Sequence, residues 1–208
     1  MCIRDRSQDR TQKELEDVLY SSLEEYNRMT KMVSDMLFLA QADNNQLISD
    51  RVIFDLSTEV IKVFDFFEAW AEERNIMLKL NGIPCLIEGD PQMFRRAINN
   101  LLSNALRYTP EGHAVTVSIR EQENYFDLIV ENPGKPIPEE HLSRLFDRFY
   151  RVDPSRQRKG EGSGIGLAIV KSIVAAHHGK VHVESDAHST RFILSVPGVK
   201  SVNPISQH

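Results

Sequence analysis

The chain has 208 residues, which is enough for one ordinary domain and an accessory element. Its hydrophobic (41%) and charged (26%) fractions are typical of a globular protein, and its net charge of −5 argues against a dedicated nucleic-acid binder. Cys2 and Cys85 are too few and too far apart for a disulfide framework or a zinc site, which indicates a reducing compartment. Charges interrupt the apolar runs and the first ten residues have no apolar core, so we expect a soluble chain without a membrane span or a signal peptide.

A long helix is predicted from Gln12 to about Ala40, because this segment lacks Gly and Pro and its apolar positions step by fours and threes. The resulting stripe consists of Leu15, Leu19, Ser22, Tyr26, Met29, Val33, Met36 and Ala40. A single helix cannot bury such a stripe by itself. Since the chain has no second helix of this kind, we expect a partner helix from another chain. A linker is predicted at residues 43–46.

The remainder of the chain mixes short strands with helices. Strands are predicted at 51–55, 76–80, 85–88, 115–120, 126–131, 180–184 and 191–196. Helices are predicted from a cap at Ser57 to about Arg74, from a cap at Asp90 through Ala105, and from about Gly164 to Ala176. Because strands and helices do not alternate strictly, we predict an α+β fold with a layer of helices on one face of one sheet.

The helix after Asp90 contains the first candidate site. Asn100 and Asn104 are four residues apart and therefore share one helix face, while the apolar residues between them face the core. Two amide oxygens on one face suit Mg²⁺, which takes its other ligands from water and substrate phosphates. Arg107, one turn further on, suits a phosphate oxygen. The alternative is that both asparagines are ordinary exposed helix residues.

Two other segments contain glycine where a ligand would approach the backbone. Residues 131–138 (ENPGKPIP) follow a strand, where Gly134 permits close approach of a flat ligand and Asn132 offers an amide to the edge of a base; the alternative is an ordinary Pro/Gly turn. Residues 160–167 (GEGSGIGL) lead into a helix, whose free N–H groups favour phosphates. Positive charge precedes these glycines at Arg148, Arg151, Arg156, Arg158 and Lys159. This basic stretch suits a mobile lid over a triphosphate, or alternatively a solvated loop or a surface for a nucleic acid or acidic partner.

Five segments in order resemble the catalytic half of sensor histidine kinases, whose ATPase fold is shared with gyrase, Hsp90 and MutL. They are NLLSNALRYTP, VENPGKPIPEEHL, RLFDRFYRVDPSR, GEGSGIGLAIVKSIV and STRF. The resemblance implies that residues 47–198 form a two-layer α/β sandwich of the GHKL ATPase (Bergerat) type that binds ATP and Mg²⁺. Residues 7–46 resemble the second helix of the dimerisation and phosphotransfer hairpin with its linker, which implies a homodimer through this helix. The segments are most similar to those of heavy-metal sensors of the copper/silver type.

The resemblance also implies roles for individual residues. Asn104, with Asn100 beside it, would hold Mg²⁺, while Arg107 and Tyr108 would line the phosphate and sugar region. Asn132 stands where most of the family has an aspartate that accepts from the adenine amino group, and an asparagine carbonyl can accept the same bond. The other implied nucleotide contacts are Gly134, Ile137, Lys159, Gly162, Gly164, Ile165, Gly166, Leu167 and Thr190.

The histidine that such a kinase phosphorylates is missing from the sequence. The seven histidines are His113, His141, His177, His178, His182, His188 and His208. None lies in the family's H-[DE]-L-R-x-P pattern, so we expect nucleotide binding without self-phosphorylation. Residues 1–6 (MCIRDR) match nothing expected upstream, which predicts a non-native start, and residues 199–208 are predicted to be a tail.

The resemblance further implies what a full-length parent does. Anchored through a missing N-terminal part on the cytoplasmic side of the bacterial inner membrane, it would pass a phosphoryl group from ATP to a histidine and then to an aspartate of a response regulator. We expect the fragment itself to be soluble and cytoplasmic, with no nucleic-acid partner. Two rival functions remain: a serine kinase of the anti-sigma type with the same fold, and a non-catalytic fragment that binds ATP or a partner.

Overall fold

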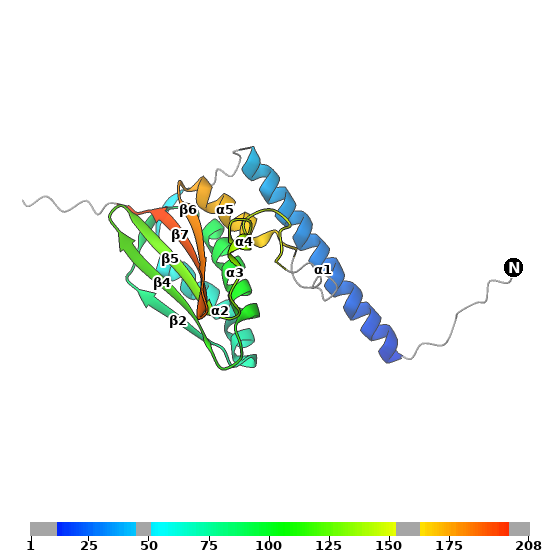
Figure 1. Cartoon of the computed structure of the whole chain (residues 1–208). Coiled ribbons are helices and arrows are strands. Elements are labelled where there is room, and N and C mark those ends of the chain that lie inside the picture. Colours follow the sequence, from blue (N-terminus) through cyan, green and yellow to red (C-terminus); the bar gives the residue numbers. More distant parts are fainter. Residues whose placement is uncertain (1–11, 45–50, 153–162, 200–208) are drawn as a thin grey trace, which may run out of the picture.

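A computed structural model describes residues 12–44, 51–152 and 163–199, and it shows a long helix beside a sandwich of helices and one main sheet (Figure 1). The main sheet consists, in spatial order, of β2 (Met77–Gly82), β4 (Ala114–Gln122), β5 (Tyr125–Pro133), β7 (Ser189–Pro197) and β6 (Lys180–Ser185). β2 and β4 are parallel, and the other neighbouring strands are antiparallel.

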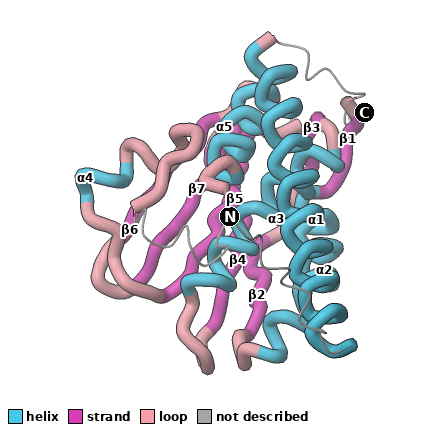
Figure 2. The backbone as a smooth tube through the Cα atoms, turned by 90° about the vertical axis from the view of Figure 1, so that its right-hand side faces the viewer, coloured by secondary structure: helices cyan, strands magenta, loops and turns pink. Residues whose placement is uncertain are grey.

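Three helices cover one face of this sheet: α2 (Leu56–Glu73), α3 (Pro91–Tyr108) and α5 (Gly166–Ala176) (Figure 2). Each helix buries one apolar stripe, and β4, β5 and β7 bury alternate residues opposite these stripes. A single hydrophobic core results between the two layers. The predicted two-layer α/β sandwich is confirmed.

The first strand departs from the predicted single sheet. β1 (Val52–Asp55) pairs only with β3 (Leu86–Gly89), as a separate two-stranded sheet. The predicted helix cap at Ser57 is also wrong, because Asp55 caps α2 instead. Its carboxylate accepts from the Ser57 N–H (3.0 Å), the Ser57 hydroxyl (2.8 Å) and the Cys85 N–H (2.9 Å). A carboxylate is a stronger acceptor than a hydroxyl, so Ser57 serves here as a donor.

The predicted start of α3 is confirmed. Asp90 caps the helix by accepting from the N–H groups of Gln92 (2.7 Å) and Met93 (3.4 Å). The backbone N–H of Asp90 in turn donates to Nε2 of His177 (3.1 Å), and Nδ1 of His177 lies 2.7 Å from the Ile173 carbonyl oxygen. His177 thereby joins the start of α3 to the end of α5. Burial lowers its pKa, which keeps the ring neutral so that Nε2 can accept.

The long helix α1 (Gln12–Asp43) ends at Asp43 rather than near Ala40, so the first residue of the predicted linker is helical. One side of α1 lies against the sandwich, where Phe38 and Leu39 are buried. On the same side the Asp35 carboxylate accepts from the Arg96 guanidinium (2.6 Å), which also lies 4.2 Å above the Phe38 ring. Asp43 pairs with Arg148. Sandwich and helix are therefore joined by apolar, ionic and cation–π contacts.

The predicted stripe occupies another side of α1 and is exposed. The large apolar residues of the stripe that are exposed are Leu15, Leu19, Tyr26, Met29, Val33 and Met36. Among the described residues, no other element covers these six side chains. None of the helices in residues 12–44, 51–152 and 163–199 has the length and apolar character that a membrane crossing requires. The predicted non-native start at residues 1–6 lies outside the described residues. A small helix that the sequence did not predict, α4 (Glu139–Leu142), follows the Pro-rich turn after β5.

Candidate functional site

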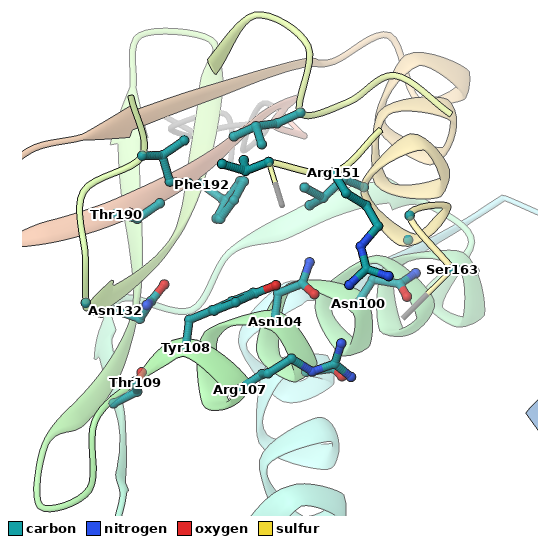
Figure 3. Close-up of a pocket in the computed structure, with 18 of the residues that line it drawn as sticks. Asn100, Asn104, Arg107, Tyr108, Thr109, Asn132, Arg151, Ser163, Thr190 and Phe192 are labelled. Atoms are coloured by element: carbon teal, nitrogen blue, oxygen red, sulfur yellow. The ribbon is translucent and has the colours of Figure 1, made fainter. Parts of the chain in front are cut away.

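A cavity of about 1710 Å³ lies between α3, the turn after β5, the start of α5 and α1 (Figure 3). The predicted residues that line it are Asn100, Asn104, Arg107, Tyr108, Asn132, Gly134, Ile137, Gly164, Gly166, Leu167 and Thr190. Ile165 instead is fully buried in the core, and Lys159 and Gly162 lie outside the described residues. Three motifs that are far apart in the sequence thus meet at one cavity.

The position of the asparagines follows from the amphipathic pattern of α3. The helix buries one face from Phe94 to Leu106, and this fixes the direction in which its polar residues project. Asn100 and Asn104 are both half-buried and line the cavity. In Figure 3 the two amides project from α3 into the same space, with the Arg151 guanidinium close by.

The alternation of β5 and β7 places two polar groups at the end of the core face. Leu128 and Val130 point into the core, and the next inward position of β5 is Asn132. Its cross-strand partner in β7 is Thr190, and the two residues are only 5% and 6% exposed. Nδ2 of Asn132 donates to the Pro133 carbonyl (3.1 Å), which leaves Oδ1 as an acceptor toward the cavity.

Hydrogen bonds hold the turn after β5 against the sheet. The hydroxyl of Ser185 accepts from the Ile137 N–H (2.9 Å) and lies 2.8 Å from the Thr190 hydroxyl. Ile137 and Thr190 both line the cavity. This end of the cavity therefore combines an apolar side chain with a rigid pair of polar groups, which suits a flat heterocycle with a polar edge.

Two glycines stand where the segments touch. A Cβ on Gly166 would lie 3.0 Å from Oδ1 of Asn100, so the first residue of α5 lies directly against the asparagine face of α3. A Cβ on Gly134 would lie 3.1 Å from the Tyr108 carbonyl oxygen. Glycine allows both close approaches, and these approaches bring the three motifs together.

The start of α5 is suited to an anion. Its N-cap, Ile165, makes no side-chain capping bond. The first N–H groups of the helix, at Gly166 and Leu167, lack intrahelical partners and lie at the positive end of the helix dipole. Both residues line the cavity. A phosphate group placed there would find free donors.

Charge on the cavity walls is unevenly distributed: α1 contributes both signs, including the cations Arg28 and Lys31, whereas the described part of the sandwich contributes cations only. From the sandwich and its loops come four cationic residues, Arg74, Arg107, Lys135 and Arg151. The acidic residues among the described lining set are Glu24, Glu25 and Asp35, all from α1. The walls formed by the sandwich are consequently basic or neutral and complement a polyanion.

Comparisons with known proteins agree with this geometry. Residues 89–200, more than half of the chain, match the family described as "Histidine kinase-, DNA gyrase B-, and HSP90-like ATPase". The chain belongs to this ATPase family. It is 80% identical over 205 residues to "Probable sensor kinase SilS" of Salmonella typhimurium, and 66% identical over 191 residues to "Sensor histidine kinase CusS" of Escherichia coli K12. These alignments cover 97% and 92% of the chain but only 41% and 40% of the two relatives.

Solved structures show the same fold in other members of the ATPase family. Acinetobacter baumannii histidine kinase AdeS superposes with a TM-score of 0.74 at 24% identity, over 87% of this chain and 84% of that one. The catalytic domain of histidine kinase ThkA superposes with a TM-score of 0.65 at 25% identity, over 72% of this chain and 97% of that one. The predicted fold and family are both confirmed.

Some residues of this ATPase-family site were not predicted from the sequence. Arg74 lies in no motif, between α2 and β2, and carries no signal of its own. Tyr150 also lines the cavity; its hydroxyl lies 2.6 Å from Nδ1 of His141, and Arg144 stacks on its ring at 4.3 Å. The lining residues on α1 were missed because the apolar stripe indicated a different face of that helix. Of the predicted basic lid, Arg151 lines the cavity and Arg148 pairs with Asp43, while Arg156, Arg158 and Lys159 lie outside the described residues.

Proposed function

We propose that the chain is the ATP-binding catalytic portion of a two-component sensor histidine kinase. In the full-length protein it would donate the γ-phosphate of ATP to a histidine, from which the phosphoryl group passes to an aspartate of a response regulator. The observation that carries the proposal is the meeting of three features at one cavity: the asparagine face of α3, the buried Asn132–Thr190 pair and the uncapped start of α5. The names of the relatives, which are sensor kinases, favour this function over an anti-sigma serine kinase.

The chemistry of the walls orients the nucleotide. The adenine would lie at the end formed by Asn132, Ile137 and Thr190, with Oδ1 of Asn132 accepting from its exocyclic amine. The phosphates would lie at the other end, where the first N–H groups of α5 and the Arg151 guanidinium provide donors. Tyr108 lies between the two ends (Figure 3), where it would line the ribose region.

The residues present fit a magnesium ion that is held jointly with the nucleotide. Within the described ranges no group of three or more His, Cys, Asp or Glu side chains is arranged as a metal site. Asn100 and Asn104 nevertheless offer two amide oxygens beside the phosphate end, and Mg²⁺ commonly takes the rest of its ligands from water and substrate phosphates. When bound, the ion would neutralise phosphate charge. The contribution of the chain is then to place the γ-phosphate for in-line attack by a histidine nitrogen.

The long helix α1 supports a homodimeric parent protein. Its exposed stripe supports a homodimer through this helix, because large apolar side chains at helical spacing are otherwise left in water. We further infer a parent of the copper/silver sensor type, in view of the identity to SilS and CusS, anchored in the inner membrane through a segment that precedes this chain.

A titration with a fluorescent ATP analogue tests the proposal. We expect binding that is strengthened by Mg²⁺, and we expect Asn104→Ala to remove most of the Mg²⁺-dependent gain. The matched control is Asn99→Ala, on the same helix but outside the cavity lining. Absence of binding by the wild-type chain, or an equal loss in the two variants, would contradict the assignment.

Incubation with labelled ATP tests the expectation that this chain does not phosphorylate itself. Since none of the seven histidines lies in the family pattern, the isolated chain should stay unlabelled while it binds the analogue. Acid-labile, base-stable label on any of these histidines would refute that expectation.

A further inference from the structure

Arg74 links the end of α2 to the C-terminal end of α3, the helix that carries Asn100 and Asn104. It is the C-cap residue of α2, is half-buried and lines the cavity. Its Nη1 donates to the Leu106 carbonyl and its Nη2 donates to the Thr109 carbonyl (3.0 Å). Both of these bonds go to main-chain oxygens at the C-terminal end of α3, and not to a carboxylate.

The end of a helix leaves its last carbonyl groups without intrahelical donors. In α3 the Ala105 carbonyl is satisfied by the N–H (3.0 Å) and the hydroxyl (2.7 Å) of Thr109. The Leu106 carbonyl receives its bond from Arg74. The planar guanidinium has several donors in fixed directions, so it can hold two carbonyls that are three residues apart, whereas an ammonium group cannot match that geometry.

The held segment belongs to the nucleotide site. Tyr108 lies between the two carbonyls that Arg74 binds, and Tyr108 and Thr109 both line the cavity (Figure 3). The Tyr108 carbonyl would lie 3.1 Å from a Cβ on Gly134, so this end of α3 touches the turn that follows Asn132. A shift of the helix end would therefore alter the spacing between Tyr108 and the base end of the cavity.

The positive charge of Arg74 also acts on the C-terminal end of α3. The C-terminal end of a helix carries partial negative charge, and in α3 this end lines the cavity at Tyr108 and Thr109. A guanidinium bonded to the terminal carbonyls offsets this charge where the helix faces the cavity.

We propose that Arg74 is a positioning residue for nucleotide binding: it holds the Tyr108–Thr109 end of α3 against the turn at Gly134 and so sets the width of the base end of the cavity. The inference rests on the proposed function, since it assumes that the cavity takes a nucleotide. Arg74 acts through Tyr108 and the turn and makes no contact with the reacting phosphate.

The test compares Arg74→Ala, Arg74→Lys and the control Arg120→Ala, which removes an exposed guanidinium from β4. Affinity for the fluorescent ATP analogue should fall about tenfold in Arg74→Ala and about threefold in Arg74→Lys, and should stay unchanged in the control. Amide hydrogen exchange provides the second measurement. It should accelerate in Arg74→Ala at residues 106–112 while residues 94–102 of α3 stay protected.

The outcomes separate the two proposals. A wild-type chain that fails to bind the analogue refutes the proposed function. A wild-type chain that binds, together with an Arg74→Ala variant of equal affinity, overturns the positioning role. Faster exchange throughout α3 and the sheet also overturns it, because Arg74 would then only stabilise the fold. Local exchange with a graded loss of affinity supports it.

Discussion

Replacing Gly166 by alanine would test whether the asparagine face of α3 and the start of α5 act as one site. The added Cβ would lie 3.0 Å from Oδ1 of Asn100, so the amide would have to retreat by a few tenths of an ångström. Gly166 does not have a positive φ, and alanine is the better helix former, so the substitution should leave stability unchanged or raise it by up to about 1 kcal/mol. The perturbation is therefore confined to the site.

The expected loss follows from the strict geometry of magnesium. Its oxygen ligands lie at about 2.0–2.1 Å in a near-ideal octahedron, so a ligand displaced by a few tenths of an ångström is largely lost. We expect Gly166→Ala to bind the Mg²⁺ form of the fluorescent ATP analogue about tenfold more weakly, which is about 1.4 kcal/mol. Without Mg²⁺ the affinity should change little. Titrations at two Mg²⁺ concentrations and a thermal melt measure these quantities.

A double-mutant cycle with Asn100→Ala sharpens the test. If alanine at 166 acts by displacing the Asn100 amide, the double variant should bind no more weakly than Asn100→Ala alone. Ser172→Ala, on the same helix but away from the cavity, is the control. Additive losses in the double variant, or wild-type affinity in Gly166→Ala, would refute the argument.

Three further predictions concern the fold around the site. Because burial lowers the pKa of His177, the unfolded chain takes up a proton that the folded chain excludes, so stability should fall as the pH drops through about 6.5. In urea unfolding at pH 7.5 and 5.5, His177→Gln should retain the bond from Asp90 and lose much of this pH dependence; an unchanged dependence would show that other groups cause it. Burial, and after it the charge of neighbouring carboxylates, raises the pKa of Cys85 to about 12. Iodoacetamide at pH 8 should therefore modify this buried thiol only after the chain unfolds. Rapid modification in the folded chain would argue against its burial. Asp35→Asn should weaken the ion pair with Arg96 and accelerate amide exchange in α1 while leaving the melting temperature of the sandwich nearly unchanged; exchange equal to wild type would show that the apolar contacts suffice.

The parts of the site that could be predicted are those that regular periodicity produces. Asn100 and Asn104 share a face because the helix repeat places residues four apart above one another. Asn132 is buried because β5 alternates, so the position after Leu128 and Val130 again faces inward. In both cases the apolar neighbours determine the direction of the polar side chain, and these neighbours are visible in the sequence.

The parts that could not be predicted depend on contacts between distant segments. Where β1 pairs with β3, Asp55 also accepts from the Cys85 N–H, 30 residues away in the sequence, and no local pattern indicates either contact. Arg74 finds its partners at the end of another helix. The side of α1 that lies on the sandwich has too few buried apolar residues, chiefly Phe38 and Leu39, to produce a periodic signal.

The two-sided use of α1 has a mechanical consequence. A helix moves as a nearly rigid rod, so any rotation that a second protein imposes on the exposed stripe also turns the side that carries Asp35. Side-chain tips lie about 5 Å from the helix axis, so a rotation of about 20° moves them by about 2 Å. That displacement is comparable with the 2.6 Å ion pair to Arg96, which lies one helical turn before Asn100. Torsion applied at the stripe would thus reach the asparagine face of α3 through the Asp35–Arg96 pair, beside the apolar contacts of Phe38 and Leu39.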